Sequence, residues 1–438
     1  MFIKLHSWKI PSHLWIAATG WLSRILIGLV QLVSIPVFYQ KLGLHDFAVF
    51  TVITGLVAWY SLLDLGIGTA LQNFISEYRV QEKKSAALIT AVIPLLVLLI
   101  FGIAILIALL GGTLKTWLFS HLPNNLTVEN FDIILFLYCT NFVFLIGNKV
   151  LFAYHKGFWG YAYQLMGYII LLILMCIIHF FHVSLDLSKA LYYWIIPLFL
   201  SSMVMMVHAF KISDAKLQNF NWNTVFYKQL MLRAMKFWLV AFSANGVLAI
   251  DYLVIVKLLS AQDIIAYNIV NKIFMMMLFI YAAVLSALWP VLAEHYARRT
   301  VQNYMIAERE LKRSIIGGII YMLFATLCLV LLRNFITEIF RVHQAIALSI
   351  MLLLSFGFYG CLRVFIDTYT TALQARNQMR LFIWLTPLQA IVAIPAMIYL
   401  AKFGLIGVMS ALILSFVVLP LWIIPSAHYR NLGFLKHV

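Results

Sequence analysis

The stretch AALITAVIPLLVLLIFGIAILIALL, residues 86–110, decides the fold class of this chain. It contains no charged residue, and it is longer than the roughly 20 apolar residues that an α-helix needs to cross a bilayer. Similar blocks recur along the 438 residues, of which 64% are hydrophobic and 11% charged. A water-soluble protein could not bury that much apolar surface, so lipid has to be the solvent.

The apolar blocks predict about twelve transmembrane helices. They are continuous rather than alternating with a period of two, which favours helices over a β-barrel. The predicted spans are 16–39, 47–70, 86–110, 131–153, 161–181, 190–210, 236–257, 264–289, 314–333, 346–372, 381–401 and 404–426. The fold class is therefore an all-α polytopic membrane protein.

The formal net charge of +16 reflects membrane topology rather than nucleic-acid binding. With both termini in the cytoplasm, most basic residues fall in the inner connections, as the positive-inside rule requires. The outer connections hold only Lys41, Lys115, Lys189, Lys257, Arg333, Arg341 and Lys402. This distribution predicts cytoplasmic N- and C-termini and excludes nucleic acid as a partner.

A polar interruption at 211–236 divides the chain into two related halves. Residues 42–50 (LGLHDFAVF) match residues 259–267 (LSAQDIIAY), and the same register carries Glu77 onto Glu294. Each half holds six predicted spans, so the repeats share one orientation in the membrane. We therefore expect a six-helix lobe at 1–210, a cytoplasmic linker at 211–236 and a second six-helix lobe at 237–438.

Ionisable side chains inside predicted spans are candidates for function, because each costs about 2.5–3.5 kcal/mol on insertion scales. The candidates are Arg24, Asp64, Lys149, Asp251, Lys272, Arg363 and Asp367.

Depth along the spans indicates which of these side chains could pair. Arg24 could pair with Asp64 near the inner side, and Asp251 could pair with Lys272 in the outer third. Lys149 has no carboxylate at its depth in an adjoining span. These groups either neutralise one another structurally or line a water-filled cavity for an anionic ligand, and the sequence leaves both interpretations open.

Arg363 and Asp367 are four residues apart, so they are predicted to touch on one helical face. Arg363 lies near the middle of its span and cannot reach the interface. An arginine can hold phosphate oxygens with a bidentate fork. Arg363 is therefore the strongest single candidate for binding an anion.

Signatures of soluble enzymes are missing from the sequence. There is no G-x-x-x-x-G-K-[ST], no H-E-x-x-H and no G-x-S-x-G motif. The four cysteines, Cys139, Cys176, Cys328 and Cys361, lie in spans without metal-ligand spacing. We expect a transporter rather than an enzyme, with no cofactor and no bound metal.

Residues 61–77, SLLDLGIGTALQNFISE, closely resemble bacterial Wzx-type polysaccharide flippases, the O-antigen translocases. The preceding Leu42-Gly43 turn, residues 371–377 (TALQARN) and the plan of six plus six helices are similar to the same family. Those flippases belong to the multidrug/oligosaccharidyl-lipid/polysaccharide exporter superfamily, whose members share a two-lobed fold. Glycines 66 and 68 within the first motif permit either a loosened helix or the close approach of a neighbouring backbone.

The resemblance implies a substrate, a place and a mechanism. The substrate would be an oligosaccharide repeat unit on undecaprenyl diphosphate. It would move by alternating access from the cytoplasmic to the periplasmic leaflet of the bacterial inner membrane. Coupling to an ion gradient is left open. Other membrane proteins of polysaccharide assembly would be partners, besides the bilayer itself. In this scheme the proposed diphosphate ligands are Arg24, Lys149 and Arg363, with Lys272 supporting an outward step. The charges would be tuned or reset by Asp64, Asp251 and Asp367.

Two alternatives stay open at this point. A multidrug or cation antiporter of the same superfamily would favour carboxylates in its cavity, whereas the in-span candidates here are four basic and three acidic residues. A membrane polysaccharide polymerase or glycosyltransferase would need a large outer loop or carboxylates at the outer face. The longest outer connection, about 111–130, is short.

Overall fold

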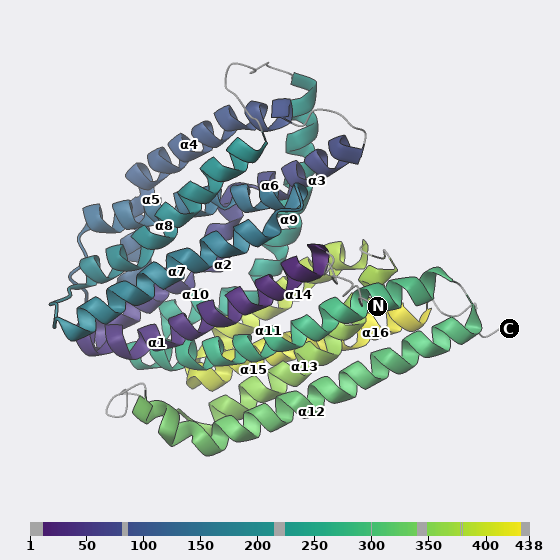
Figure 1. Cartoon of the computed structure of the whole chain (residues 1–438). Helices are drawn as coiled ribbons and strands as arrows, with labels where there is room; N and C mark the ends of the chain where they lie inside the picture. The colour runs from purple at the N-terminus through teal and green to yellow at the C-terminus, as the bar shows by residue number, and fades with distance from the viewer. Residues whose placement is uncertain are drawn as a thin grey trace, which may run out of the picture. The chain divides into compact units, whose positions relative to one another are not determined.

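A computed structural model describes residues 12–80, 86–213, 224–298, 300–339, 348–376, 378 and 380–430. Across these ranges every regular element is a helix (Figure 1). The middle of the predicted linker, residues 214–223, lies outside them. Together with the apolar composition, the helices confirm an all-α membrane protein.

The described helices fall into two groups along the sequence. The N-terminal half contains α1 (Ser12–Gly55), α2 (Val57–Tyr60), the 3-10 turn η1 (Ser61–Asp64), α3 (Ile67–Val80), α4 (Ala86–Phe119), α5 (Val128–Phe144), α6 (Ile146–Ala153), α7 (Gly157–Phe180) and α8 (Leu187–Ile212). The C-terminal half contains α9 (Thr224–Leu248), α10 (Ile250–Leu258), α11 (Ala261–Ala297), α12 (Val301–Ile339), α13 (Ile350–Ala375), α14 (Arg380–Leu400), the 3-10 turn η3 (Ala401–Phe403), α15 (Gly404–Val418) and α16 (Pro420–Arg430).

Nine stretches in the described part of the chain are long and apolar enough to cross a membrane. Two of them, Thr19–Asp64 and Arg380–Arg430, each cover two predicted spans. A left-handed glycine separates the two members in each case, Gly43 with φ +72° and Gly404 with φ +71°. The predicted span 236–257 falls on α9 and α10, which are separated at Ala249. The apolar blocks of the sequence thus correspond to helices throughout.

The chain forms two compact units. Unit 1 comprises residues 1–37, 60–117 and 126–239, and unit 2 comprises residues 38–59, 118–125 and 240–438. Within unit 1, α7 packs along α8 and α5 also packs on α8. Within unit 2, α13 packs against α11, α12 and α15. The division into lobes at 211–236 stays a prediction.

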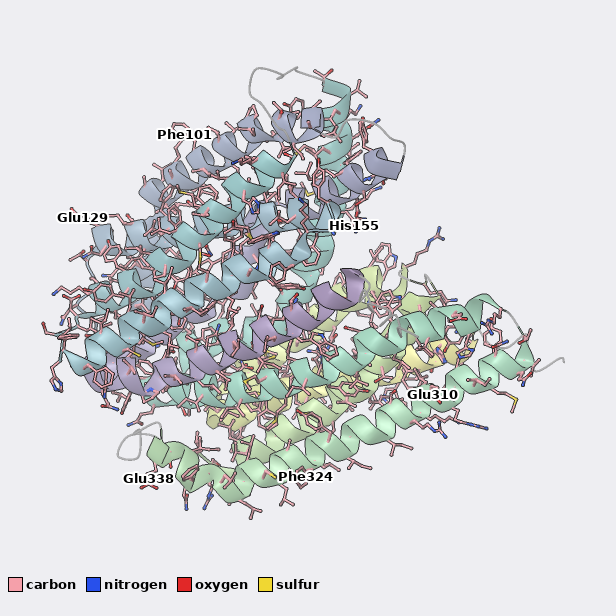
Figure 2. All side chains as sticks on the ribbon, viewed as in Figure 1. Phe101, Glu129, His155, Glu310, Phe324 and Glu338 are labelled. Carbon is pink, nitrogen blue, oxygen red and sulfur yellow. The ribbon has the colours of Figure 1, made fainter. Side chains whose placement is uncertain are left out.

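Large apolar side chains cover the outside of the helices. Phe101 on α4 is 63% exposed and Phe324 on α12 is 66% exposed, and both project away from the helix that carries them (Figure 2). Such a surface would be unstable in water and is suited to contact with acyl chains.

The helix predicted at 47–70 is broken in unit 1, between η1 and α3. Leu65 (φ +50°) and Gly66 (φ +73°) are left-handed, so the helical ladder stops there. A Cβ on Gly66 would lie 2.3 Å from the carbonyl oxygen of Ala234, which leaves room for glycine alone. The carbonyl of Leu62 accepts the amide of Leu65 at 3.1 Å, and the indole Nε1 of Trp238 also donates to it at 3.0 Å. Both expectations for this motif, a loosened helix and a close backbone approach, are confirmed at Gly66.

A second discontinuity, between α9 and α10, lies in unit 2. Its freed carbonyl at Ala249 accepts a hydrogen bond from the indole of Trp59 at 3.1 Å. In return, the amide of Asn245 donates to the carbonyl of Ala58 at 2.6 Å, just after α1 ends. Each interruption of the backbone ladder is therefore satisfied by a side chain from a helix far away in sequence, as a membrane interior demands.

Candidate functional site

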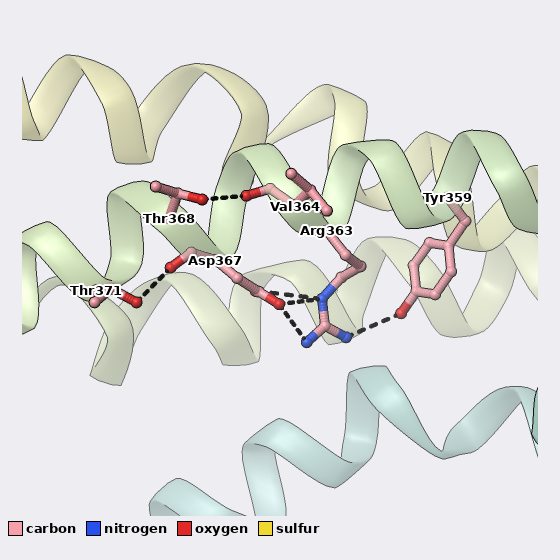
Figure 3. A network of polar contacts seen from close by, with 6 residues as sticks. All are labelled: Tyr359, Arg363, Val364, Asp367, Thr368 and Thr371. Atoms are coloured by element: carbon pink, nitrogen blue, oxygen red, sulfur yellow. Dashed lines mark hydrogen bonds and ion pairs between the residues drawn. The ribbon is translucent and has the colours of Figure 1, made fainter. Parts of the chain in front are cut away.

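Arg363 and Asp367 form an ion pair on α13 in unit 2. The Nη2 of Arg363 lies 2.9 Å from Oδ2 of Asp367, and its Nε donates to the two carboxylate oxygens at 3.1 and 3.3 Å. Figure 3 shows both side chains on one face of α13, one turn apart. The contact predicted from their spacing is confirmed.

The guanidinium is also held from the preceding turn and from a neighbouring helix. Its Nη1 donates to the hydroxyl of Tyr359 at 3.2 Å (Figure 3). Its Cζ lies 5.9 Å from the ring centroid of Phe416 on α15. These contacts engage three of the five N–H groups of an arginine. The other two N–H groups of Arg363 make no hydrogen bond within the part of the chain that the structure describes, so a ligand could accept from them.

The pair is neither fully enclosed nor free in solvent. The side chain of Arg363 is 18% exposed and that of Asp367 is 33% exposed. A guanidinium in this position is held in one direction by its contacts, and its charge is screened less than in bulk water. The arrangement can therefore exchange a carboxylate for phosphate oxygens without moving the arginine far.

Hydrogen bonds to α11 and along α13 hold the site in place. The buried hydroxyl of Thr368 lies 2.7 Å from the Tyr281 hydroxyl of α11, and it donates to the carbonyl of Val364 at 2.5 Å. Thr371 donates to the carbonyl of Asp367 at 2.8 Å (Figure 3). Packing against α12 is also close, because a Cβ on Gly360 would lie 2.2 Å from Cε of Met322. The helix that carries Arg363 is thus anchored on both sides.

Asp64 lies beside Lys149 in unit 1. A Cβ on Gly68 would lie 3.1 Å from Oδ2 of Asp64 and 3.2 Å from Cγ of Lys149, so both side chains border this glycine. The charge of Lys149 attracts the Asp64 carboxylate. The other oxygen, Oδ1, accepts the amide of Gly66 at 2.8 Å, so Asp64 itself occupies this backbone donor.

The expected pairing of Asp64 with Arg24 is therefore wrong, as is the expectation that Lys149 has no carboxylate at its depth. The depth estimate assumed a continuous helix, whereas the break at Leu65 and Gly66 turns the Asp64 carboxylate toward Gly68. The guanidinium of Arg24 instead lies 5.7 Å from the ring centroid of Tyr161 on α7.

Asp251 is bound by tyrosines rather than by Lys272, so this second expected pairing is also wrong. Its side chain is buried in unit 2, accepts the hydroxyl of Tyr267, and accepts the amide of Tyr252 at 2.7 Å. The Tyr252 hydroxyl continues the network to the carbonyl of Thr51 at 2.6 Å. The search for ion pairs in the sequence considered only charged residues. Tyrosine is neutral, so the sequence did not reveal this partner.

The seven predicted residues are divided between the units. Unit 1 holds Arg24, Asp64 and Lys149, and unit 2 holds Asp251, Lys272, Arg363 and Asp367. The sequence missed Tyr359, although its spacing of four from Arg363 was a usable signal. It also missed Phe416, which comes from another helix and had no signal. Among the described residues, no group of three or more His, Cys, Asp or Glu side chains could hold a metal ion.

No protein-family model matches the chain. Its fold is similar to that of an inward-facing multidrug-resistance MATE-family transporter of the MOP superfamily, with a TM-score of 0.76 and 14% identity over 94% of this chain and 96% of that one. It is also similar to the lipid II flippase MurJ in an inward closed conformation, with a TM-score of 0.69 and 16% identity over 94% of this chain and 87% of that one. The chain therefore has the all-α, multi-pass membrane fold that these solved structures share.

Sequence relatives refine this class. A protein named O-antigen transporter from Salmonella typhi is 32% identical over 427 residues, covering 96% of this chain and 97% of the relative. A protein named O-antigen export protein from Yersinia pseudotuberculosis is 30% identical over 431 residues, covering 95% and 96%. The chain belongs to the family of O-antigen transporters. It is a transporter and not an enzyme, and the resemblance seen in residues 61–77 is confirmed.

Proposed function

We propose that the protein is a flippase for lipid-linked O-antigen repeat units in the bacterial inner membrane. It carries an oligosaccharide on undecaprenyl diphosphate from the cytoplasmic to the periplasmic leaflet by alternating access, with both termini in the cytoplasm. The names of its relatives support the substrate class. The observation that carries the proposal is the Arg363–Asp367 pair, a partly exposed cation within a span.

In this mechanism the diphosphate competes with Asp367 for Arg363. Without substrate, Asp367 holds the guanidinium in direction and balances its charge. Phosphate oxygens bind the two unused N–H groups and then replace the carboxylate, because a guanidinium matches both acids in the same bidentate way. The prenyl tail stays in lipid, so only the charged head group and the sugars need a polar path.

The remaining charged residues take supporting roles in the proposal. Arg24 and Lys149 attract the diphosphate in unit 1, where Asp64 restrains Lys149 between cycles. Lys272 supports the outward step. Asp251, which is buried and accepts the hydroxyl of Tyr267, is our choice for a coupling proton. The two predicted lobes, 1–210 and 237–438, are the bodies that rock, with 211–236 between them and other polysaccharide-assembly proteins as neighbours in the membrane.

The test follows the lipid-linked repeat unit in cells that lack this gene. We expect single repeat units to accumulate facing the cytoplasm, with loss of the surface polymer, and the gene supplied in trans to restore both. Accumulation facing the periplasm would instead indicate a defect in polymerisation. A normal surface polymer with increased sensitivity to cationic drugs would favour the antiporter alternative.

A further inference from the structure

A cluster of aromatic and basic side chains lies in unit 1, where α7 begins and α8 ends. The ring centroid of His208 on α8 lies 5.4 Å from that of Trp159 and 5.6 Å from that of Tyr163, both on α7. Lys156 directly precedes α7, and Lys211 follows His208 by three residues in the last turn of α8. None of these residues belongs to the candidate site or to the mechanism proposed above.

The two lysines bring positive charge to this cluster without a counter-charge. Both side chains are exposed, and both charges act on the His208 ring, whereas no carboxylate of the described residues does so. Neither lysine forms an ion pair within the part of the chain that the structure describes. Like charges that act on one place repel one another, so an anion bound there would relieve the repulsion.

His208 adds a hydrogen-bonding group with a set direction. Its Nδ1 lies 3.0 Å from the hydroxyl oxygen of Tyr163. Its Nε2 makes no hydrogen bond with the described residues and is not one of their buried unpaired atoms, so it lies at the surface of the unit. When the Tyr163 hydroxyl donates to Nδ1, the neutral ring carries its proton on Nε2. His208 can therefore donate to an anion without any change of charge.

The helix ends at the cluster also favour an anion. No side chain caps the N-terminus of α7 at Lys156, and the first N–H groups of a helix have no partner within it. These groups and the helix dipole attract negative charge. The C-terminus of α8 carries the opposite partial charge, and Lys211 in its last turn offsets it.

Exposed apolar side chains continue from the cluster along both helices. They follow Trp159 on α7 and Lys211 on α8 at helical spacing, and they are Met166, Ile170 and Ile173 on α7 and Leu200, Val204 and Val207 on α8. Since α7 packs along α8, both rows end at the same polar cluster. A charged group beside two apolar rows matches the division of a phospholipid into head group and acyl chains.

We propose that this end of α7 and α8 binds an anionic phospholipid. The phosphate lies between Lys156 and Lys211 and accepts Nε2–H of His208, and the acyl chains follow the two apolar rows. Trp159 lies at the level of the interface, where indole rings are favoured. A zwitterionic head group would bring an ammonium that the two lysines repel, so the site selects anionic lipids, as basic pockets between transmembrane helices do.

The test measures phospholipid binding to the purified full-length protein by native mass spectrometry. The probes are phosphatidylglycerol and phosphatidylcholine with the same acyl chains. Each lysine near an anionic lipid surface contributes roughly fivefold in affinity. We therefore expect K156Q/K211Q to bind phosphatidylglycerol roughly 25-fold more weakly than wild type and phosphatidylcholine equally well. The variant K156R/K211R keeps both charges and should retain the binding.

The variant K228Q/K236Q provides a matched control in unit 1. Both lysines are exposed on α9, beside Tyr227 and near it in sequence, and Tyr227 contacts α4 through the carbonyl of Ala91. This variant removes the same charge from the same unit and should bind phosphatidylglycerol as wild type does. Equal affinity of the wild-type protein for the two lipids, or equal losses in the two glutamine variants, would overturn the proposal.

Inorganic phosphate separates a lipid site from a site for free phosphate. An excess of it should leave phosphatidylglycerol bound, because the acyl chains also hold the lipid on α7 and α8. Displacement of the lipid by inorganic phosphate would contradict the proposal. All probes are ordinary phospholipids or phosphate, so the result does not depend on the transport assignment.

Discussion

Replacing Arg363 with alanine removes the guanidinium and leaves Asp367, which is 33% exposed, without its cation. Loss of a charge-assisted hydrogen bond costs about 1.5–3 kcal/mol, so we expect surface polysaccharide to fall roughly ten- to hundredfold. Arg363→Lys keeps the charge but loses the planar fork, and we expect a value between alanine and wild type. Polysaccharide gels from complemented deletion cells, with immunoblots for protein abundance, measure both.

Arg313→Ala is the matched control for this experiment. Arg313 also pairs with a carboxylate on its own helix, Glu310 at 2.9 Å, but its side chain is 67% exposed. Exposed pairs contribute little, so this variant should retain normal polysaccharide. Normal polysaccharide in Arg363→Ala at wild-type abundance would rule out Arg363 as a substrate ligand.

At the residue scale, the sequence could predict contacts within one helix and failed for contacts between helices. Arg363 and Asp367 touch because a spacing of four fixes them on one face. The break in the helix sets the direction of the Asp64 carboxylate and therefore its partner. Counting residues from the membrane edge gives the depth of a residue but not the direction of its side chain. Lys149 and Asp64 meet only because the fold brings α3 and α6 together.

At the scale of elements, the break before α3 predicts that adding a single methyl group at Gly66 strongly lowers the free energy of unfolding. Gly66→Ala would force a left-handed alanine and place its Cβ 2.3 Å from the Ala234 carbonyl oxygen. We expect a loss of about 2 kcal/mol or more in the free energy of unfolding. Thermal unfolding of the purified protein in detergent measures the change.

Gly102→Ala on α4 is the comparison within unit 1, since a Cβ at Gly102 would meet nothing within 4 Å. It should raise the free energy of unfolding by about 0.5–1 kcal/mol, because alanine is favoured over glycine inside a helix. Equal stability of the two variants would contradict the close approach of α9 to Gly66.

The apolar blocks predicted the positions of the helices well, because a segment that crosses the bilayer must be apolar whatever it packs against. They located helix breaks less well. The predicted span 47–70 reads as one apolar block, yet it contains η1 and two left-handed residues. Asp64 and Gly66 supplied a signal for the break, but the discontinuity at Ala249 had none, because it depends on Trp59 from elsewhere in the chain.

At the scale of the whole molecule, the distribution of basic residues predicts which connections face the cytoplasm. After replacement of Cys139, Cys176, Cys328 and Cys361, a cysteine at His155 should be protected from a membrane-impermeant thiol reagent in intact cells. A cysteine at Lys402 should react, because it lies in an outer connection. The measurement is labelling in intact against permeabilised cells, and the reverse pattern would invert the proposed orientation.

The hydrogen bonds from α9 to α2 and η1 have a consequence for biogenesis. Trp238 and Asn245 serve the carbonyls of Leu62 and Ala58, across sequence separations of 176 and 187 residues. A ribosome adds about 5–20 residues per second, so the early helix waits roughly 10–40 s for its partners to be synthesised. During that interval these two carbonyls lack their side-chain donors, and water at the membrane surface or the insertion machinery must take the place of those donors. A nascent chain that ends before Trp238 should therefore remain bound to that machinery, and one that extends beyond α10 should leave it.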